Sequence, residues 1–595
     1  MPEIRIDPLG KKIIAEPGLS LREVLRRAGI LLDYPCGGKG TCRQCRVSLD
    51  PAPRGGRGKL SESESAGGVR LACQVVVETD CTVTIPEERL SARDWKAGLR
   101  EEEISGAAEG SLRRLRVTLP EPSLEDQRPD WERLTAALGR EGVSAARPDA
   151  RFLEHISAVL RETGWSADAI CDENQLLWMD GGEGGAAGLA VDLGTTTVDV
   201  ALVDLEKGAL LGRRALLNQQ VAFGADVISR AQSFHEDRGP VRAAGLRTIE
   251  EGARALLADA GVSASRIVKT VVVGNPIMIH ILHGMDPWQL TRLPYIPLAS
   301  NALSADPREL GWAFQEHGVV ETLPLVSAYV GADTVGMILA LDLDTEDSTS
   351  LSIDIGTNGE MVIARHGELL ATSTAAGPAF EGAQISCGMR ALPGAVTAAT
   401  VSWDGAVSLQ VVGDIPPRGI CGTGLVSAVA QLLEREVLDA TGRLVDQSEA
   451  PTPGLGARIF PLGSEPAFAL SDDRKVYVSQ KDIRTLQLAK GAVRTGIDTL
   501  LELTGLAEDG LSAVRLAGNF GAGLDAGAAM RIGLIPPMDL AKVHVVGNAA
   551  LRGAIRALLS RPCFRRSEEA ARRTRFVELG GKPEFQNRFM EAMLF

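Results

Sequence analysis

Four cysteines near the amino terminus constrain the fold more than any other feature of this sequence. Cys36, Cys42 and Cys45 follow the spacing C-x5-C-x2-C, and Cys73 comes after 27 intervening residues. Three thiolates in one tight Gly-rich loop and a fourth farther along are typical of a [2Fe–2S] cluster. Small zinc sites usually combine two C-x2-C pairs, and this segment has one. A structural zinc loop and unconnected thiols are the alternatives that the spacing leaves open.

The segments around the cysteine loop predict a β-grasp domain. Residues 4–15 alternate and turn like a hairpin, and Ser20 with Glu23 forms a capping-box pair at the start of a helix that ends before Gly29. After the loop, three segments predict strands: CRVSL, CQVVVE and CTVTIP. This order resembles [2Fe–2S] ferredoxins over residues 1–90, although the loop has one residue more than the plant-type C-x4-C-x2-C spacing.

Length and charge limit the classes of function. A chain of 595 residues is long enough for several domains. Its 63 Lys and Arg against 77 Asp and Glu give a net charge of −14, which argues against nucleic acid as a partner. The first residues lack a basic–apolar signal pattern, and no apolar stretch is long enough to cross a bilayer. The cysteines outside the loop motif are scattered, which fits a reducing compartment and predicts a cytoplasmic protein.

A linker and a small domain are predicted after the ferredoxin-like segment. Residues 91–110 are charged and rich in Gly and Ala, as linkers are. Residues 111–187 predict a small α+β middle domain, with a strand in LRRLRVTLP and helices at 131–138 and 151–163. The Gly-rich run at 181–188 lacks the Lys-Ser/Thr of a P-loop, so we interpret it as a connection.

A duplicated motif is the second strong signal. GLAVDLGTTTVDVALVD contains Asp192, and LSIDIGTNGEMVIAR contains Asp354, 162 residues later. Each copy is an apolar strand, a D-x-G-T turn and a second apolar strand. Backbone N–H groups and Thr hydroxyls at such turns can bind phosphate oxygens, and an aspartate at the strand end can orient Mg²⁺ or its waters. Two facing copies would hold the phosphates of a nucleotide from both sides.

The pair of turns resembles phosphate 1 and phosphate 2 of the superfamily that contains acetate and sugar kinases, chaperone ATPases and actin. The resemblance implies a two-lobed ribonuclease-H-like (actin-like) ATPase over residues 188–595, with the nucleotide in the cleft. Gly-rich turns at 419–424 and 516–524 resemble adenosine-side motifs of that superfamily. Asp482 is predicted to cap a helix that serves lobe packing.

Four further segments are more particular: GNPIMIHILHGMDP, SAYVGADTVGM, STAAGPAFEGAQISCGMRA and VGNAALRGA. Together with the ferredoxin-like segment they resemble the reductive activators of corrinoid proteins, over nearly the whole chain. The overall prediction is therefore a multidomain α/β chain. The resemblance implies ATP-dependent return of an electron to the Co(II) corrinoid of a methyltransfer protein, a low-potential electron donor and a homodimer.

The candidate site residues follow from these motifs and resemblances. The cluster ligands are Cys36, Cys42, Cys45 and Cys73. The candidate catalytic carboxylates are Asp192, Asp354 and Asp333, the last of which could instead be a simple helix-start residue. The candidate nucleotide-binding residues are Asp192, Gly194, Thr195, Thr196, Asp354, Gly356, Thr357, Asn358, Gly377, Gly422, Gly424 and Gly518. The predicted cofactors are the [2Fe–2S] cluster, ATP and Mg²⁺. Ser386 is a candidate corrinoid contact, with loop packing as the alternative.

Other functions remain open at this point. ATP-driven electron donors of radical dehydratases or aromatic-ring reductases have the same ATPase fold, and a small-molecule kinase or a chaperone-like remodeller with a regulatory cluster is a more distant possibility. His280 and His283 are three residues apart, but no third ligand accompanies them, so ordinary helix histidines are favoured over a metal site.

Overall fold

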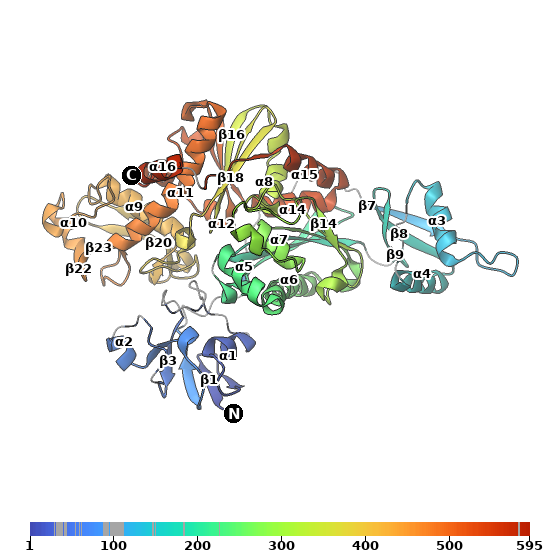
Figure 1. Cartoon of the computed structure of the whole chain (residues 1–595), viewed down its shortest axis with the longest axis horizontal. Helices are drawn as coiled ribbons and strands as arrows, with labels where there is room; N and C mark the ends of the chain where they lie inside the picture. Colours follow the sequence, from blue (N-terminus) through green and yellow to red (C-terminus); the bar gives the residue numbers. More distant parts are fainter. Residues whose placement is uncertain are drawn as a thin grey trace.

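The computed structural model of the chain describes residues 1–28, 30, 32, 38, 40, 45–53, 55–58, 60, 62–86, 94–95, 112–144, 148, 150–182, 185–224, 226–580 and 583–595. Figure 1 shows an amino-terminal domain, a small domain at the far end of the molecule and two central lobes. The predicted linker 91–110 lies outside the described residues except for 94–95, which form strand β6 (Asp94–Trp95).

The amino-terminal domain has the predicted β-grasp arrangement. Its five-stranded sheet has the order β2-β1-β5-β3-β4, in which β1 and β5 are parallel. The elements are β1 (Glu3–Asp7), β2 (Lys11–Ile14), α1 (Leu21–Arg27), β3 (Arg46–Asp50), α2 (Glu62–Ala66), β4 (Val69–Leu71), the 3₁₀ turn η1 (Ala72–Gln74) and β5 (Cys81–Thr84). Ile4 and Ile6 of β1 and Val83 of β5 are buried, because alternate residues of each strand face the same core.

One predicted strand of this domain is wrong. CQVVVE is not a strand of the sheet, because Cys73 lies in the turn η1 and Val76 forms only an isolated bridge with Ser20. The backbone of Val75 and Val77 bonds instead to the residues just before helix α1 and at its start, including a 2.8 Å bond from the Leu21 N–H to the Val75 carbonyl. The turn thereby holds Cys73 beside Cys45.

The small domain spans residues 112–180. Its sheet is β7 (Leu112–Thr118), β8 (Ser166–Asp172) and β9 (Gln175–Asp180), and two helices, α3 (Asp130–Arg140) and α4 (Ala150–Glu162), cover one face. Both predicted helices are present. A buried ion pair of 2.7 Å joins Asp172 of β8 to Lys269 of the first lobe, and Trp178 stacks on His317 with ring centroids 3.6 Å apart. The small domain is therefore fixed to the first lobe.

Two lobes whose sheets share an order of five consecutive strands form the centre of the molecule. The first lobe contains β10 (Ala187–Leu193), β11 (Thr197–Asp204), β12 (Ala209–Leu217), α5 (Val227–Glu236), α6 (Arg238–Ala260), β13 (Ile267–Val273), α7 (Pro276–Leu282), β14 (Leu303–Ala305), β15 (Val319–Thr322) and α8 (Ala332–Ala340). Its sheet order is β14-β15-β13-β10-β11-β12-β6.

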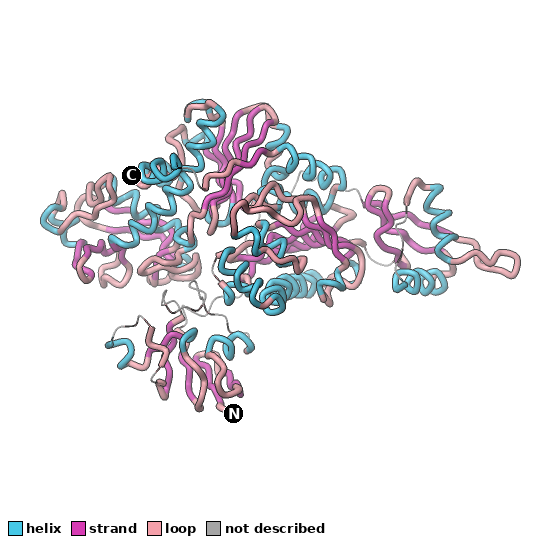
Figure 2. The backbone as a smooth tube through the Cα atoms, in the orientation of Figure 1, coloured by secondary structure: helices cyan, strands magenta, loops and turns pink. Residues whose placement is uncertain are grey.

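The second lobe repeats this pattern. Its main sheet has the order β26-β25-β16-β17-β18-β27, from strands β16 (Thr349–Ile355), β17 (Gly359–Arg365), β18 (Glu368–Thr374), β25 (Ala513–Ala517), β26 (Val543–Gly547) and β27 (Arg575–Phe576). In both lobes three consecutive antiparallel strands are continued by two parallel ones, as a ribonuclease-H-like duplication requires, and the first lobe adds the antiparallel edge strand β14. Figure 2 shows the two sheets as separate bundles of strands.

Helices and two small sheets complete the second lobe. The helices are α9 (Gly422–Glu434), α10 (Pro453–Arg458), α11 (Gln480–Thr504), α12 (Gly518–Gly521), α13 (Ala526–Arg531), α14 (Ala549–Leu559), α15 (Arg561–Arg573) and α16 (Pro583–Ala592). The small sheets consist of β19 (Ala395–Val401), β20 (Val407–Val411) and β21 (Gly419–Ile420), and of β22 (Ile459–Leu462), β23 (Glu465–Ala469) and β24 (Tyr477–Ser479).

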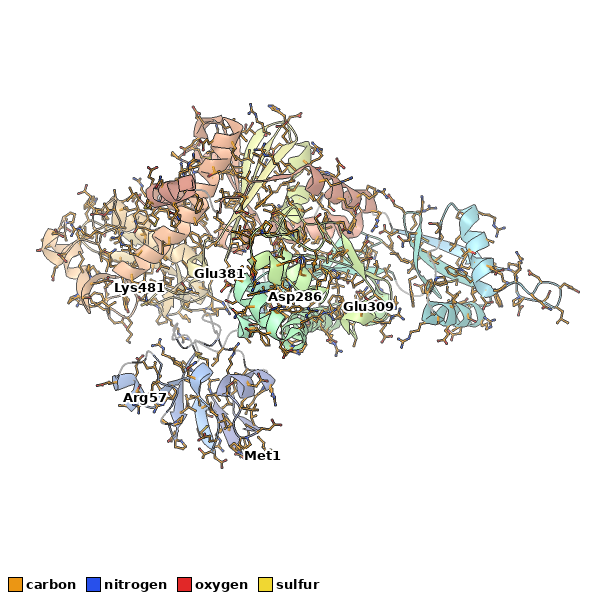
Figure 3. The ribbon with its side chains drawn as sticks, viewed as in Figure 1. Met1, Arg57, Asp286, Glu309, Glu381 and Lys481 are labelled. Carbon is orange, nitrogen blue, oxygen red and sulfur yellow. The ribbon has the colours of Figure 1, made fainter. Side chains whose placement is uncertain are left out.

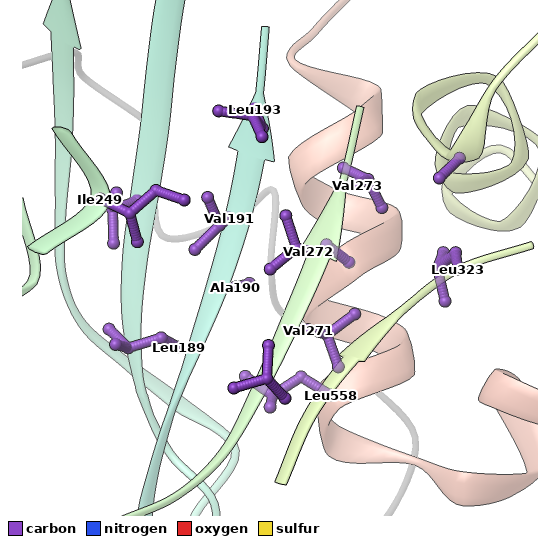
Figure 4. Packing of buried hydrophobic residues seen from close by; sticks show 14 of the residues in the cluster. Leu189, Ala190, Val191, Leu193, Ile249, Val271, Val272, Val273, Leu323 and Leu558 are labelled. Carbon is purple, nitrogen blue, oxygen red and sulfur yellow. The ribbon is translucent and has the colours of Figure 1, made fainter. Parts of the chain in front are cut away.

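A pair of helices connects the two lobes. Helix α14 packs on the core of the first lobe, where Leu558 lies beside Val271 (Figure 4), while Met337 of α8 packs in a cluster with Val362 of the second lobe. The two helices touch backbone to backbone, because a Cβ on Gly553 would lie 1.9 Å from the Gly336 carbonyl oxygen. No helix in the described part of the chain is long and apolar enough to cross a membrane.

Candidate nucleotide-binding site and cluster ligands

A cavity of about 450 Å³ lies between the two lobes. Both D-x-G-T turns contribute to its wall, and most of the predicted nucleotide-binding residues line it. These are Asp192, Gly194, Thr195, Thr196, Asp354, Gly356, Thr357, Asn358, Gly422 and Gly518, together with the candidate catalytic residue Asp333. The duplicated motif therefore comes together in space as its sequence predicts.

The two turns are held in shape by their own backbones. In the first turn, a Cβ on Gly194 would lie 2.6 Å from the Thr197 carbonyl oxygen, so only glycine fits there. Asn218 supports this turn by donating to the Gly194 carbonyl at 2.8 Å. In the second turn, the Gly356 N–H donates to the Asn358 carbonyl at 2.8 Å. Each turn follows a buried strand, so its Thr hydroxyls and N–H groups have fixed positions at the cavity.

Helix N-termini also point at the cavity. Asn275 precedes helix α7, Asp333 lies in the first turn of α8, Gly422 begins α9 and Asn548 precedes α14. The first N–H groups of a helix have no partner within the helix, and the helix dipole is positive at that end. This arrangement favours an anionic ligand such as the phosphates of a nucleotide.

Four carboxyl groups surround the same space, of which Glu360 is buried and the other three are half-buried. Burial, and then the charge of Asp333, raises the pKa of Asp354 to about 7. Burial also raises the pKa of Asp333 to about 6, although hydrogen bonds from Thr334 oppose the change. The pKa values of Asp192 and Glu360 are raised well above their ordinary values, again mainly by burial. Such a group of mutually repelling acids accepts a cation readily.

The glycines of the Gly-rich turns have different roles. A Cβ on Gly518 would lie 2.3 Å from Asp354 Oδ1, and a Cβ on Gly422 would lie 1.8 Å from the Phe380 carbonyl oxygen. Gly424 does not line the cavity. A Cβ at this position would lie 2.1 Å from the Val396 carbonyl oxygen, so glycine is needed here for the close packing of α9 on β19. Gly377 also lies off the cavity wall, and its N–H donates to the Thr357 carbonyl at 2.9 Å.

Several cavity residues were missed by sequence reasoning. The side-chain amide of Asn548 donates to Asp192 Oδ2 at 2.8 Å and to Asp199 Oδ2 at 3.0 Å, and so joins the start of helix α14 to the first turn. Glu381 accepts a hydrogen bond from the Thr357 hydroxyl. Asn275, Glu360 and Arg390 complete this group. The segments VGNAALRGA and GPAFEG contained the first two residues, but nothing local in them indicated which side chain faces the cavity.

The Ser386 hydroxyl is engaged by its own lobe. It donates to Asp482 Oδ1 at 3.0 Å and lies 3.0 Å from the Ser479 hydroxyl, and the Ser386 N–H donates to the same Asp482 oxygen at 2.7 Å. This favours the loop-packing interpretation in the structure as it stands. The predicted helix cap is shifted by three residues, because Ser479 is the N-cap of α11 and Asp482 is its capping-box partner.

The two histidines of α7 have ordinary structural surroundings. His280 is fully buried, with Nδ1 2.7 Å from the Pro276 carbonyl oxygen, and its Nε2 accepts the Leu298 N–H at 3.2 Å. Burial lowers the pKa of His280, and it lowers that of His283 to about 4. Both rings are therefore neutral side chains of the lobe core.

Two of the four candidate cluster ligands belong to the described residues. Cys45 is buried, and its Sγ lies 3.3 Å from that of Cys73. This separation is far longer than a disulfide, which measures about 2.05 Å, and it allows both sulfurs to bind one iron. Gly38 and Gly40 have positive φ, and Gly38 accepts a 2.6 Å hydrogen bond from Gln74. Cys36 and Cys42 lie outside the described residues. The paired thiolates and the glycine backbone beside them fit a [2Fe–2S] cluster.

Family models match most of the chain. Residues 4–78 match the 2Fe-2S iron-sulfur cluster binding domain, residues 101–183 the RACo linker region and residues 187–346 the RACo middle region. Residues 348–595 match the C-terminal domain of RACo, the ASKHA domain. The first and last models support a [2Fe–2S] cluster and ATP binding, respectively.

Named relatives and one solved structure agree with these models. A corrinoid activation enzyme, RamQ, from Eubacterium limosum is 28% identical over 602 residues, which cover 96% of this chain and 95% of the relative. The [Co(II) methylated amine-specific corrinoid protein] reductase of Methanosarcina barkeri is 26% identical over 61% of this chain and 68% of its own length. A solved structure of a reductive activator for a corrinoid, iron-sulfur protein is 33% identical, covers 100% of this chain and 98% of that one, and has a TM-score of 0.72. The chain belongs to the family of reductive activators of corrinoid proteins.

Proposed function

We propose that this chain is an enzyme that couples ATP to electron transfer. It returns one electron, through its [2Fe–2S] cluster, to the inactive Co(II) corrinoid of a methyltransfer protein and regenerates Co(I). The observation that carries the proposal is the union, in one chain, of a paired-thiolate site and a phosphate-binding cavity between two lobes. The full-length relatives named for corrinoid activation support the choice of acceptor.

The energetics explain why the two modules occur together. When bound, a plant-type [2Fe–2S] cluster supplies one electron at about −400 mV. The Co(II)/Co(I) couple lies at a very low potential, and every 59 mV of deficit is about tenfold in a one-electron equilibrium. Binding of ATP between the lobes can change how the chain binds the corrinoid protein. The free energy of ATP binding can thereby drive the uphill electron transfer.

The proposed roles of the nucleotide-site residues follow from their positions. Thr195 and Thr196 of the first turn and Thr357 and Asn358 of the second would bind phosphate oxygens from opposite sides. Glycines at 194, 356, 422 and 518 leave room for that approach. Asp354, at the end of β16, would orient the attacking water, since its raised pKa makes it a better proton acceptor than an exposed aspartate.

Magnesium is part of the proposal. Among the described residues, no three His, Cys, Asp or Glu side chains are grouped so as to hold a metal ion by themselves. Mg²⁺ keeps several waters and is usually held by one or two carboxylates together with substrate phosphates. One or two of Asp192, Asp333 and Asp354 would serve in that kind of site, because these carboxyl groups repel one another until a cation arrives.

The remaining assignments are proposals of the same kind. We propose Cys36, Cys42, Cys45 and Cys73 as the cluster ligands, and domains at 1–90, 111–187 and 188–595 with a linker at 91–110. We also propose a low-potential electron donor, a homodimer and a cytoplasmic location without nucleic acid or membrane partners. Cysteine ligation of a cluster fits a reducing compartment.

An anaerobic assay tests the function. The reduced, cluster-loaded chain is mixed with a Co(II) corrinoid protein from the same cell, and the Co(I) absorbance is followed with and without Mg-ATP. Co(I) should form only with Mg-ATP. Cys45→Ala should lose Co(I) formation and retain nucleotide binding, and Asp354→Ala should lose ATP turnover and retain the cluster spectrum. Cys563→Ala, a buried cysteine of α15, is the matched control and should behave as the wild type.

Failure has a clear meaning in this assay. If cluster and ATP turnover are intact but several corrinoid partners give no Co(I), the corrinoid acceptor is wrong. A radical dehydratase or ring reductase then becomes the acceptor to test.

A further inference from the structure

Glu381 is a cavity carboxylate to which the proposed hydrolysis assigns no task. It ends the 3₁₀ turn η9 (Pro378–Glu381), and both Glu381 and Thr357 line the cavity. The Thr357 hydroxyl donates its hydrogen bond to Glu381 Oε1. A hydroxyl has one proton to donate, so Thr357 cannot donate to Glu381 and to a phosphate oxygen at the same time. A nucleotide that takes this hydroxyl would therefore release Glu381.

An arginine of the first lobe has an N–H donor that is not used in a hydrogen bond within the described residues. Arg230 of helix α5 is fully buried, and it donates from Nε to the Gly224 carbonyl at 2.9 Å and from Nη1 to Met278 Sδ at 3.6 Å. Its Nη2 has no hydrogen-bond partner among the residues that the structure describes. Buried guanidinium groups are almost always paired, so this donor requires an explanation.

Glu381 is one of the two carboxylates whose charges act on this guanidinium. Burial lowers the pKa of Arg230 to about 10, and the charges of Asp226 and Glu381 oppose that change, so both carboxylates lie within electrostatic reach. Asp226 already accepts the Ser229 N–H at 2.8 Å and the Ser229 hydroxyl at 2.6 Å as the N-cap of α5. Figure 3 shows Glu381 where the second lobe meets the helices of the first.

The segment behind Glu381 is packed tightly enough to transmit a movement. The Phe380 carbonyl oxygen abuts Gly422, and a Cβ on Gly382 would lie 2.1 Å from the Met389 carbonyl oxygen. The chain from Phe380 to Met389 is thus one closely packed unit, and it contains Ser386, the candidate corrinoid contact.

We propose that Glu381 is a positioning residue that reports nucleotide occupancy. Without nucleotide it holds the Thr357 hydroxyl. When the terminal phosphate takes that hydroxyl, Glu381 turns to Nη2 of Arg230, joins the second lobe to α5, and moves the 380–389 segment. This inference deepens the proposed function and rests on it for the identity of the nucleotide.

Hydrogen exchange of the full chain tests the inference. Backbone exchange of α5 is measured without nucleotide and with Mg²⁺ and a non-hydrolysable ATP analogue, whose binding is measured separately by titration. In the wild type the analogue should slow exchange of α5 by about tenfold, because a charge-assisted hydrogen bond must break before the helix opens. In Glu381→Gln the analogue should bind and leave the exchange of α5 unchanged.

A second variant acts in the opposite direction. Thr357→Val keeps the shape of the side chain and removes the hydroxyl, so Glu381 is released without any ligand. Exchange of α5 should then be slow in the absence of nucleotide. Glu465→Gln, an exposed carboxylate of β23, is the matched control and should respond as the wild type.

The outcomes separate this inference from the proposed function. Slowing of α5 by bound analogue in Glu381→Gln, or rapid exchange of α5 in nucleotide-free Thr357→Val, would overturn the role of Glu381. Failure of the analogue to bind the wild type would instead overturn the nucleotide site, and the nucleotide-free comparison of Thr357→Val with the wild type would still test the release of Glu381.

Discussion

Replacement of Gly518 by alanine should inactivate ATP turnover by displacing one carboxylate. A Cβ at this position would lie 2.3 Å from Asp354 Oδ1, a distance that carbon and oxygen do not tolerate. Ordinary van der Waals contact begins at 3.4 Å, so Asp354 or the backbone of α12 must move by about 1 Å. Displacement of that size at a reacting centre costs about 10²-fold in rate, or about 2.7 kcal/mol of the activation barrier.

The substitution has a second cost that must be separated from the first. Gly518 has a φ of +81°, which costs an alanine about 1–2 kcal/mol of folding free energy. Gly505 ends helix α11 in the same lobe with a φ of +64°, and a Cβ there would meet nothing within 4 Å. Gly505→Ala therefore has a similar backbone cost without the contact on Asp354.

Steady-state ATP turnover and thermal unfolding of both variants decide the question. Both should unfold at a slightly lower temperature than the wild type, and only Gly518→Ala should lose about 10²-fold in kcat. An unchanged kcat in Gly518→Ala would refute the reasoning, because Asp354 would then tolerate displacement. Equal loss of kcat in the two variants would assign the effect to backbone strain.

Three further predictions concern charge and stability. Lys269→Met should lower the free energy of unfolding, measured with denaturant, by about 3–5 kcal/mol, because the Lys269 ammonium is paired at 2.7 Å with the buried carboxylate of Asp172 in the small domain. Lys207→Met, at an exposed position, should have little effect. Asp333→Asn should abolish ATP turnover yet raise the unfolding temperature at pH 8, because the raised pKa means that ionisation of Asp333 opposes folding; an unchanged unfolding temperature would contradict this. Burial lowers the pKa of Lys490 from 10.5 to about 8. Between these pH values the unfolded chain binds more protons than the folded chain, so the free energy of unfolding should rise with pH. Lys490→Met should remove that rise, whereas Lys481→Met, on the exposed face of the same helix, should keep it.

Local patterns predicted the parts of the site that local geometry determines. Asp192 and Asp354 each end a buried strand, and a D-x-G-T turn after such a strand places its hydroxyls and N–H groups at the strand end regardless of the rest of the chain. The β-grasp order was predictable for the same reason, because hairpin, capped helix and cysteine loop are each local signals.

Residues that reach the site from far along the chain were not predictable in this way. Asn548 bonds to Asp192 across 356 positions, and in the sequence it is an ordinary asparagine before a helix. Gly422 and Gly424 look alike in the sequence, yet the first lines the cavity and the second packs against β19. The CQVVVE segment alternates like a strand, but the turn at Cys73 prevents it from joining the sheet.

The contact of helices α8 and α14 explains how events in the cavity can reach the rest of the molecule. Both helices begin at the cavity, one with Asp333 and the other after Asn548, and they meet where Gly336 and Gly553 allow backbone contact. Helix α14 packs mainly on the first lobe, whereas α8 has residues in the core clusters of both lobes. Packed interfaces of this kind do not deform continuously but change between discrete arrangements. Because α8 packs on both lobes and Lys269 fixes the small domain to the first lobe, we expect a nucleotide that moves α8 relative to α14 to shift the second lobe relative to the first lobe and the small domain together.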